Sequence, residues 1–250
     1  MLKRIAVMTS DTAFAEAAEK AAAKLNTQVI ITALDADVPP AGTTAIVLNR
    51  KEIPKGIESA IVLSAWGEDL LALLSNAVDC REGILEGSGR RIMDRASRFA
   101  QALGLSPEDQ MALERGALVR DIGKTRVTND VLLKSGLLTY DEWQLIRKHP
   151  RFGAEIASEM PVLQDLTAII QSHHECYDGT GYPDGLEGEA IPYLARIMKI
   201  LDVYCAMTSP RHYRKTHSTH EEAVEHLRSE QGKHFDPHLV EVFITGCVGQ

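Results

Sequence analysis

Two adjacent histidines, His173 and His174, are the residues of this chain that point most directly to chemistry. A glycine-rich segment ending at Pro183 follows them closely. Imidazole nitrogens and carboxylate oxygens are common ligands of divalent transition metals in proteins. Further ligands of these two types are available at Asp121, His149 and Asp202. The sequence therefore predicts a divalent-metal site built from these five side chains.

The geometry expected for the histidine pair follows from the helix predicted over residues 163–174. Neighbouring side chains on an α-helix point about 100° apart. We therefore expect His173 and His174 to face different directions, so that one of them could serve only to orient a ligand through a hydrogen bond. For His149 a plain surface histidine is the alternative, but its place among the other candidate ligands favours metal binding.

The composition is that of an ordinary globular protein, with 44% hydrophobic and 25% charged residues. The net charge of −8 argues against a nucleic-acid groove but is compatible with a local cationic pocket for a small anionic nucleotide. The four cysteines are scattered, so we expect reduced thiols and a cytoplasmic location. No stretch approaches the roughly 20 apolar residues that span a bilayer, and we expect no membrane segment.

Residues 1–78 are predicted to form a small α/β domain. Short β-branched runs bounded by Pro, Gly and Asn are typical of a parallel sheet that is covered on both faces. The predicted strands are residues 4–8, 28–32, 45–48 and 60–63, and the predicted helices are residues 13–25 and 68–79. The leucines of this last helix are equally suited to a homodimer seam and to the core of the domain.

The layout of this first domain is similar to a truncated receiver domain of the flavodoxin-like fold. Receivers carry a phosphate-accepting aspartate after the third strand, and Asn49 stands at about that place. An asparagine cannot form an acyl phosphate, so we expect a receiver-like protein-interaction domain without phosphorelay chemistry. A small α/β adaptor unrelated to receivers is an equally good reading.

Residues 79–250 are predicted to form an all-α domain, in which residues 79–105 are a connecting helical region. Ile92, Ala96, Phe99 and Leu103 form an apolar stripe of helical spacing. Later helices are predicted over residues 110–120, 141–160, 163–174 and 193–208. Helix starts are indicated by Ser106 before a proline and by the capping boxes that begin at Thr139 and Thr219.

The helical part resembles the HD-GYP family, metal-dependent phosphodiesterases of the bacterial messenger cyclic di-GMP. The resemblance covers roughly residues 88–245, and its motifs are too dense to arise by chance. The matching stretches are residues 121–124, 132–139, 148–150, 173–175, 178–186, 202–204 and 235–237, together with Arg211 and Tyr213.

The resemblance implies an all-α HD-type domain that binds two or three metal ions, commonly iron or manganese, and hydrolyses a phosphodiester. Asp121 would bridge the metals, and Lys124 would act with it in catalysis. The nucleotide phosphates would be contacted by Arg120, Lys124, Gly181, Tyr182, Pro183 and Arg211. Family domains can also contact diguanylate cyclases through the glycine-rich loop, which makes such a domain the natural partner.

Two positions depart from the family pattern. The histidine of the HD dipeptide is Arg120, and an early ligand histidine is Ser88, which lies where a helix would start. Arginine has no lone pair to offer a metal. We hypothesise that Arg120 replaces one metal ion as the local cation and pairs with Asp121 or Asp202. The alternative is that Arg120 points outward and leaves a weakened site.

These observations lead to a degenerate HD-GYP protein of cyclic di-GMP signalling, with weak or absent phosphodiesterase activity and one metal ion or none. Its output would come from binding a cyclic dinucleotide or another protein. The first alternative is a working phosphodiesterase with a reduced metal site, acting on cyclic di-GMP or a related phosphodiester. The second is a structural scaffold that binds no nucleotide.

Overall fold

The computed structural model describes residues 3–8, 27–32, 44–47, 67–82, 87–209 and 218–248. Strands β1 (Lys3–Met8), β2 (Thr27–Thr32) and β3 (Thr44–Val47) form a parallel sheet in the order β2-β1-β3. Three of the predicted strands are thus present and parallel. The predicted strand over 60–63, the predicted helix over 13–25 and Asn49 lie outside the described residues, and the receiver-like assignment stays a prediction.

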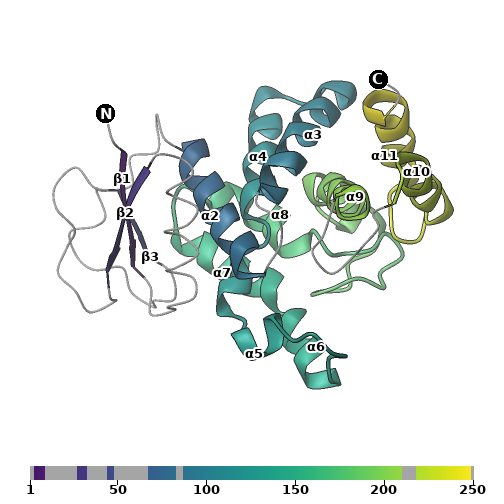
Figure 1. The fold of residues 1–250 in the computed structure, drawn as a ribbon. Coiled ribbons are helices and arrows are strands. Elements are labelled where there is room, and N and C mark those ends of the chain that lie inside the picture. Colours follow the sequence, from purple (N-terminus) through teal and green to yellow (C-terminus); the bar gives the residue numbers. More distant parts are fainter. Residues whose placement is uncertain are drawn as a thin grey trace.

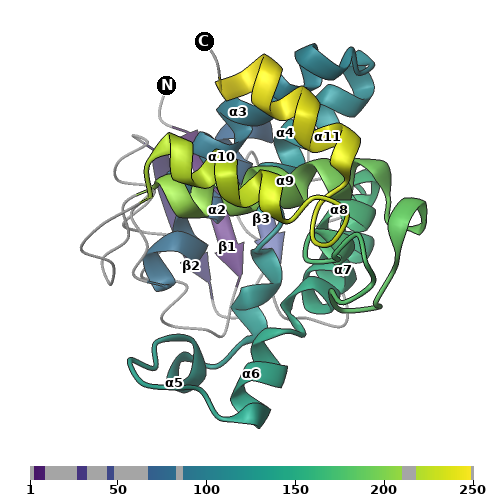
Figure 2. The same ribbon diagram turned by 90° about the vertical axis from the view of Figure 1, so that its right-hand side faces the viewer.

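The predicted all-helical domain is confirmed over the later described residues (Figures 1 and 2). Its helices are α2 (Gly67–Arg81), α3 (Ser88–Leu103), α4 (Pro107–Val119), α5 (Asn129–Leu132), α6 (Tyr140–Ile146), α7 (His149–Glu159), α8 (Thr167–Ser172), α9 (Tyr193–Thr208), α10 (His220–Ser229) and α11 (Pro237–Phe243). Short single-turn segments are η1 (Ile122–Arg126), η2 (Gln164–Leu166), η3 (Gly188–Ala190) and η4 (Ile244–Val248). Among the described residues, no helix is long and apolar enough to cross a membrane.

The helix starts follow the predicted capping residues. The Ser106 side chain accepts a hydrogen bond from the Asp109 backbone N–H, and both Thr139 and Thr219 complete capping boxes. These side chains satisfy backbone donors that have no partner inside the helix. Helix α3 begins at Ser88, as its glycine neighbours predict.

The core is formed by apolar residues of the long helices, including α2, α3, α4 and α9. Ile92, Ala96 and Phe99 of the predicted stripe are buried on α3, and the Phe99 ring packs edge-on against Phe243 of α11. The leucines of α2 are buried in this same core. Helices α5 and α6, in contrast, project from the other helices in both views (Figures 1 and 2).

The single helix predicted over residues 141–160 is wrong, because the chain breaks between α6 and α7. Pro150 has no N–H, and in a continuous helix its ring would clash with the carbonyl of Ile146. The Ile146 carbonyl instead accepts a hydrogen bond from His149 Nδ1 at 2.9 Å. The break therefore turns the His149 ring inward and fixes it at the start of α7.

The helix predicted over residues 163–174 is also shorter than expected, since α8 ends at Ser172. His173 is the residue that caps it, and its Nδ1 lies 2.8 Å from the Ile170 carbonyl. Both inward-facing histidines are thus held at helix ends by a carbonyl three residues earlier in the chain.

Candidate metal centre

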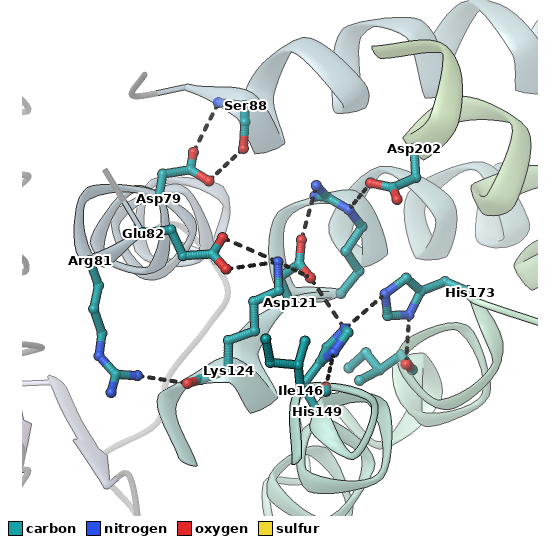
Figure 3. Close-up of polar contacts among 12 residues, drawn as sticks. Asp79, Arg81, Glu82, Ser88, Asp121, Lys124, Ile146, His149, His173 and Asp202 are labelled. Carbon is teal, nitrogen blue, oxygen red and sulfur yellow. Dashed lines mark hydrogen bonds and ion pairs between the residues drawn. The ribbon is translucent and has the colours of Figure 1, made fainter. Parts of the chain in front are cut away.

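Four of the five predicted ligands lie together. Asp121, His149, His173 and His174 each offer one ligand atom, and these atoms all lie within 4.8 Å of one another. The His149 and His173 Nε2 atoms are 3.4 Å apart, and His149 Nε2 is 3.4 Å from Asp121 Oδ1 (Figure 3). The group is assembled from the end of α4, the start of α7 and the end of α8.

The two buried histidines are oriented as metal ligands usually are. A backbone carbonyl lies within hydrogen-bonding distance of each Nδ1, so the tautomer protonated at Nδ1 leaves Nε2 with a free lone pair. Burial lowers the pKa of His149 to about 3 and also lowers the pKa of His173. Both imidazoles are therefore neutral near pH 7, which is the form that binds a metal.

His174 does not diverge from His173 in the predicted way. The two ring centroids are 4.1 Å apart, because α8 ends before the pair and the helical rotation between them is lost. The other side of the cluster is formed by Tyr182, whose ring stacks on His174 with centroids 4.8 Å apart. Burial lowers the pKa of His174 well below its usual value, so this ring too is neutral.

Arg120 points inward and joins the remaining predicted ligand to the cluster. The Arg120 side chain is buried; its Nε donates to Asp202 Oδ1 at 2.8 Å and its Nη2 lies 3.1 Å from Asp121 Oδ2. A third N–H donates to the Ala117 carbonyl at the end of α4. The predicted pairing is therefore present with both aspartates, and the outward-pointing alternative is wrong.

The charges of this group reinforce one another. Burial opposes the charged forms, but Lys124 and Arg120 hold the pKa of Asp121 well below its usual value. Burial likewise opposes ionisation of Asp202, and Arg120 lowers its pKa. For Arg120 itself the two aspartates outweigh burial and raise the pKa. The guanidinium and both carboxylates are ionised across the physiological pH range.

Lys124 is held by two carboxylates, and one of them has no part in the predicted site. Its Nζ lies 3.0 Å from Asp121 Oδ1 and 3.0 Å from Glu82 Oε1 (Figure 3).

Glu82 follows the end of α2, and Asp79 one turn earlier accepts hydrogen bonds from the Ser88 backbone and hydroxyl. Burial raises the pKa of both acids. Acidic groups at the C-terminal end of a helix are electrostatically unfavourable. The position of Asp79 and Glu82 at the end of a predicted helix is therefore the sequence signal that could have identified these two acids.

A cavity of about 430 Å³ opens beside these groups. One wall is charged and contains Asp79, Glu82, Arg120, Asp121, Lys124 and Asp202. The wall formed by α5 and α6 is apolar and contains Leu132, Trp143 and Ile146. His149, His174 and Tyr182 border the cavity as well. Such a mixed cavity suits a ligand that carries both anionic and apolar groups.

The glycine-rich loop is positioned next to this cavity by close backbone contacts. A Cβ at Gly181 would lie 2.2 Å from the Cys176 backbone nitrogen, so only glycine fits. The buried Glu175 carboxylate accepts hydrogen bonds from the backbone N–H groups of Asp184 and Leu186. The Pro183 carbonyl accepts one from Arg151. Of the predicted phosphate contacts in this loop, Tyr182 borders the cavity. Another predicted phosphate contact, Arg211, is not part of the loop and lies outside the described residues.

The donor set fits one divalent ion. Asp121 and the three neutral histidines provide one carboxylate and three imidazoles within a small radius, which is a suitable set for iron, manganese or zinc. A second ion between Asp121 and Asp202 does not fit in the same way, since the Arg120 guanidinium already lies between these carboxylates.

Comparisons with known proteins agree with this fold. A family model described as an HD domain matches residues 72–239. The cyclic di-GMP phosphodiesterase response regulator RpfG of Xanthomonas campestris is 39% identical over 180 residues, which are 71% of this chain and 47% of that protein. The 3′3′-cGAMP-specific phosphodiesterase 2 of Vibrio cholerae is 32% identical over 192 residues, 76% of this chain and 37% of that protein. The chain spans about half the length of these relatives, or less.

Solved structures show the same fold at lower sequence identity. A cyclic GMP-AMP-specific phosphodiesterase of V. cholerae superposes with a TM-score of 0.56 and 23% identity, over 71% of this chain and 47% of that one. The HD domain of the phosphodiesterase PgpH from L. monocytogenes, in complex with cyclic-di-AMP, superposes with a TM-score of 0.51 and 19% identity over 72% of this chain and 93% of that one.

Proposed function

Because the chain belongs to the HD domain family and is homologous to cyclic di-GMP phosphodiesterases of the HD-GYP type, we propose that it binds a cyclic dinucleotide. Its phosphodiesterase activity is weak or absent, because the metal centre holds at most one ion. The observation that carries this proposal is the buried Arg120 guanidinium, which lies between Asp121 and Asp202.

The metal ligands and Arg120 would have separate roles in binding the phosphates. Asp121, His149, His173 and His174 would hold the single ion, which as a Lewis acid would polarise a phosphoryl oxygen. Arg120 lines the cavity and uses three of its five N–H donors in its contacts with Asp121, Asp202 and Ala117, so the other two would be available to a phosphate oxygen.

Lys124 would compensate the remaining phosphate charge. Its ammonium group borders the cavity and is shared between Asp121 and Glu82. These two carboxylates outweigh burial and raise the pKa of Lys124, so that it stays charged. A bound phosphate therefore meets two permanent cations on the same wall. A diguanylate cyclase domain at the glycine-rich loop remains a further predicted partner.

Metal stoichiometry together with turnover tests the proposal. Protein purified without oxygen and loaded with Mn²⁺ or Fe²⁺ is expected to hold no more than one ion per chain, to bind cyclic di-GMP in calorimetry and to hydrolyse it slowly or not at all. The variant Arg120→His, alone or with Ser88→His, is expected to gain a second ion and faster turnover, since an imidazole replaces the guanidinium.

Arg115→His is the matched control, because Arg115 lies on the same helix and pairs with Asp165 away from the cavity. It should leave both metal content and turnover unchanged. Two or more tightly bound ions per wild-type chain would contradict the proposal.

A working phosphodiesterase with a reduced metal site is the second candidate, and the intact group of one aspartate and three neutral histidines favours it. This candidate predicts steady hydrolysis of a cyclic dinucleotide that depends on Mn²⁺ or Fe²⁺ and disappears in His173→Ala. Binding without such turnover favours the first candidate.

A further inference from the structure

The apolar wall of the cavity has no role in binding phosphate. Leu132, at the end of α5, and Trp143 and Ile146, on α6, form it. Phosphate groups held by Arg120, Lys124 and the metal ion would leave these apolar residues to the groups that the phosphates carry. In a nucleotide these groups include a base with two flat π-faces.

Trp143 is the aromatic ring of this wall that is still available for stacking. Its side chain is 46% exposed although it borders the cavity. No other ring and no cation contacts it among the described residues. Tyr182, the other aromatic residue at the cavity, is already engaged by His174 and by Arg147, whose guanidinium carbon lies 4.6 Å from the Tyr182 ring centre.

We propose that Trp143 stacks on a base of the bound cyclic dinucleotide. This inference rests on the proposed function, because it concerns the same cavity, but it adds a base-stacking residue on α6. It explains why a large indole ring that borders the cavity is left half-exposed.

Fluorescence of Trp143 provides the test. The chain contains two tryptophans, so the variant Trp66→Phe leaves Trp143 as the single reporter. Titration with cyclic di-GMP is expected to quench it. Loss of one base–aromatic stack weakens binding by about tenfold or more, so Trp143→Ala should lose about that much affinity in calorimetry while its melting temperature stays that of the wild type. Competition by inorganic phosphate alone should not change.

Tyr140→Ala is the matched control, since Tyr140 is an aromatic residue at the start of the same helix that is 75% exposed and does not border the cavity. It should bind cyclic di-GMP as the wild type does.

The outcomes separate this inference from the function on which it rests. If the wild type binds cyclic di-GMP and Trp143→Ala binds it equally well, the base site is wrong and the proposed function stands. If the wild type gives no heat with any cyclic dinucleotide, the proposed function fails, and the base site fails with it.

Discussion

The ionisable side chains around Asp121 depend on one another, because burial removes the water that would otherwise stabilise their charges. Arg120 contacts Asp121 and Asp202, while Lys124 contacts Asp121 and Glu82. Removing one partner of a buried ion pair typically costs about 3–5 kcal/mol, compared with about 0–1 kcal/mol for an exposed pair. The charge at position 120 thus contributes to folding.

At the same scale, the buried histidines are expected to destabilise the domain as the pH falls from 7.5 to 5.5. Burial lowers the pKa of His149 to about 3 and lowers that of His173. In the unfolded chain both titrate near pH 6.5, so below this pH the unfolded state binds protons that the folded state does not. Urea unfolding with a chelator present should show a loss of roughly 1 kcal/mol from His149 and a further loss of the same sign from His173.

The double variant His149→Asn with His173→Asn should show a flatter pH dependence than the wild type. Nitrogen NMR of the folded wild type gives a separate check, because it should report a neutral His149 ring at pH 5.5. Protonation of His149 at that pH in the folded protein would contradict the argument.

At the scale of elements, the residue types of the centre could be predicted from the sequence, but the helix ends that aim them could not. The set of aspartate and histidines was identified from its chemistry and its family motifs. The break before His149 depends on the Ile146 carbonyl being satisfied by the imidazole itself, which is a tertiary arrangement that no helix pattern reveals. The end of α8 before His173 likewise brings His174 beside His173, and no helix pattern in the sequence reveals this end.

The junction between η1 and α7 predicts a sensitive position at Gly123. A Cβ there would lie 1.9 Å from the His149 carbonyl oxygen and 2.4 Å from the Gly153 nitrogen, both of them backbone atoms that cannot rotate away. Gly123→Ala is expected to push α7 from η1, to destabilise the domain by about 1–3 kcal/mol or more, and to weaken metal binding by moving His149. Chemical denaturation and metal titration would measure the two effects.

Gly136→Ala is the control for this change. A Cβ at Gly136 would meet nothing within 4 Å, so stability should stay within about 0.5 kcal/mol of the wild type. Equal stability and equal metal affinity of the Gly123 and Gly136 variants would show that the contact between η1 and α7 does not position His149.

At the scale of the whole molecule, α2 connects the beginning of the chain to the centre. The leucines of α2 pack in the core of the helical domain, whereas the sequence assigned this helix to the preceding α/β domain, as its core or as a homodimer seam. Just beyond α2, Glu82 binds Lys124, and Arg81 at its end donates to the Lys124 carbonyl (Figure 3). Arg81 also donates to the Val127 carbonyl. The sequence indicated a leucine-rich helix here, but its pattern alone did not reveal which domain buries it.

Truncation tests the predicted domain boundary after residue 78. Each buried leucine contributes about 1.5–3 kcal/mol, so the four on α2 together rival the net stability of a typical domain, about 5–15 kcal/mol. They are Leu70, Leu71, Leu73 and Leu74. A fragment of residues 67–250 is therefore expected to be helical and to unfold cooperatively, whereas residues 79–250 should aggregate or lose cooperativity. Circular dichroism during thermal unfolding would distinguish the two.

Cooperative unfolding of the 79–250 fragment at the same temperature would place α2 outside the folding unit and would support the boundary predicted from the sequence. Failure of the 67–250 fragment to fold would mean that α2 depends on residues before it. Either result would revise the role given to α2.

The guanidinium at position 120 is covalently part of the chain, and this has a consequence for the conditions under which the site works. Chelation cannot extract it, a competing element cannot replace it, and oxygen cannot change its valence. The positive charge at that end of the cavity is therefore independent of the supply and redox state of any metal ion. A centre that relied on ions alone would lose this charge whenever the metal became scarce.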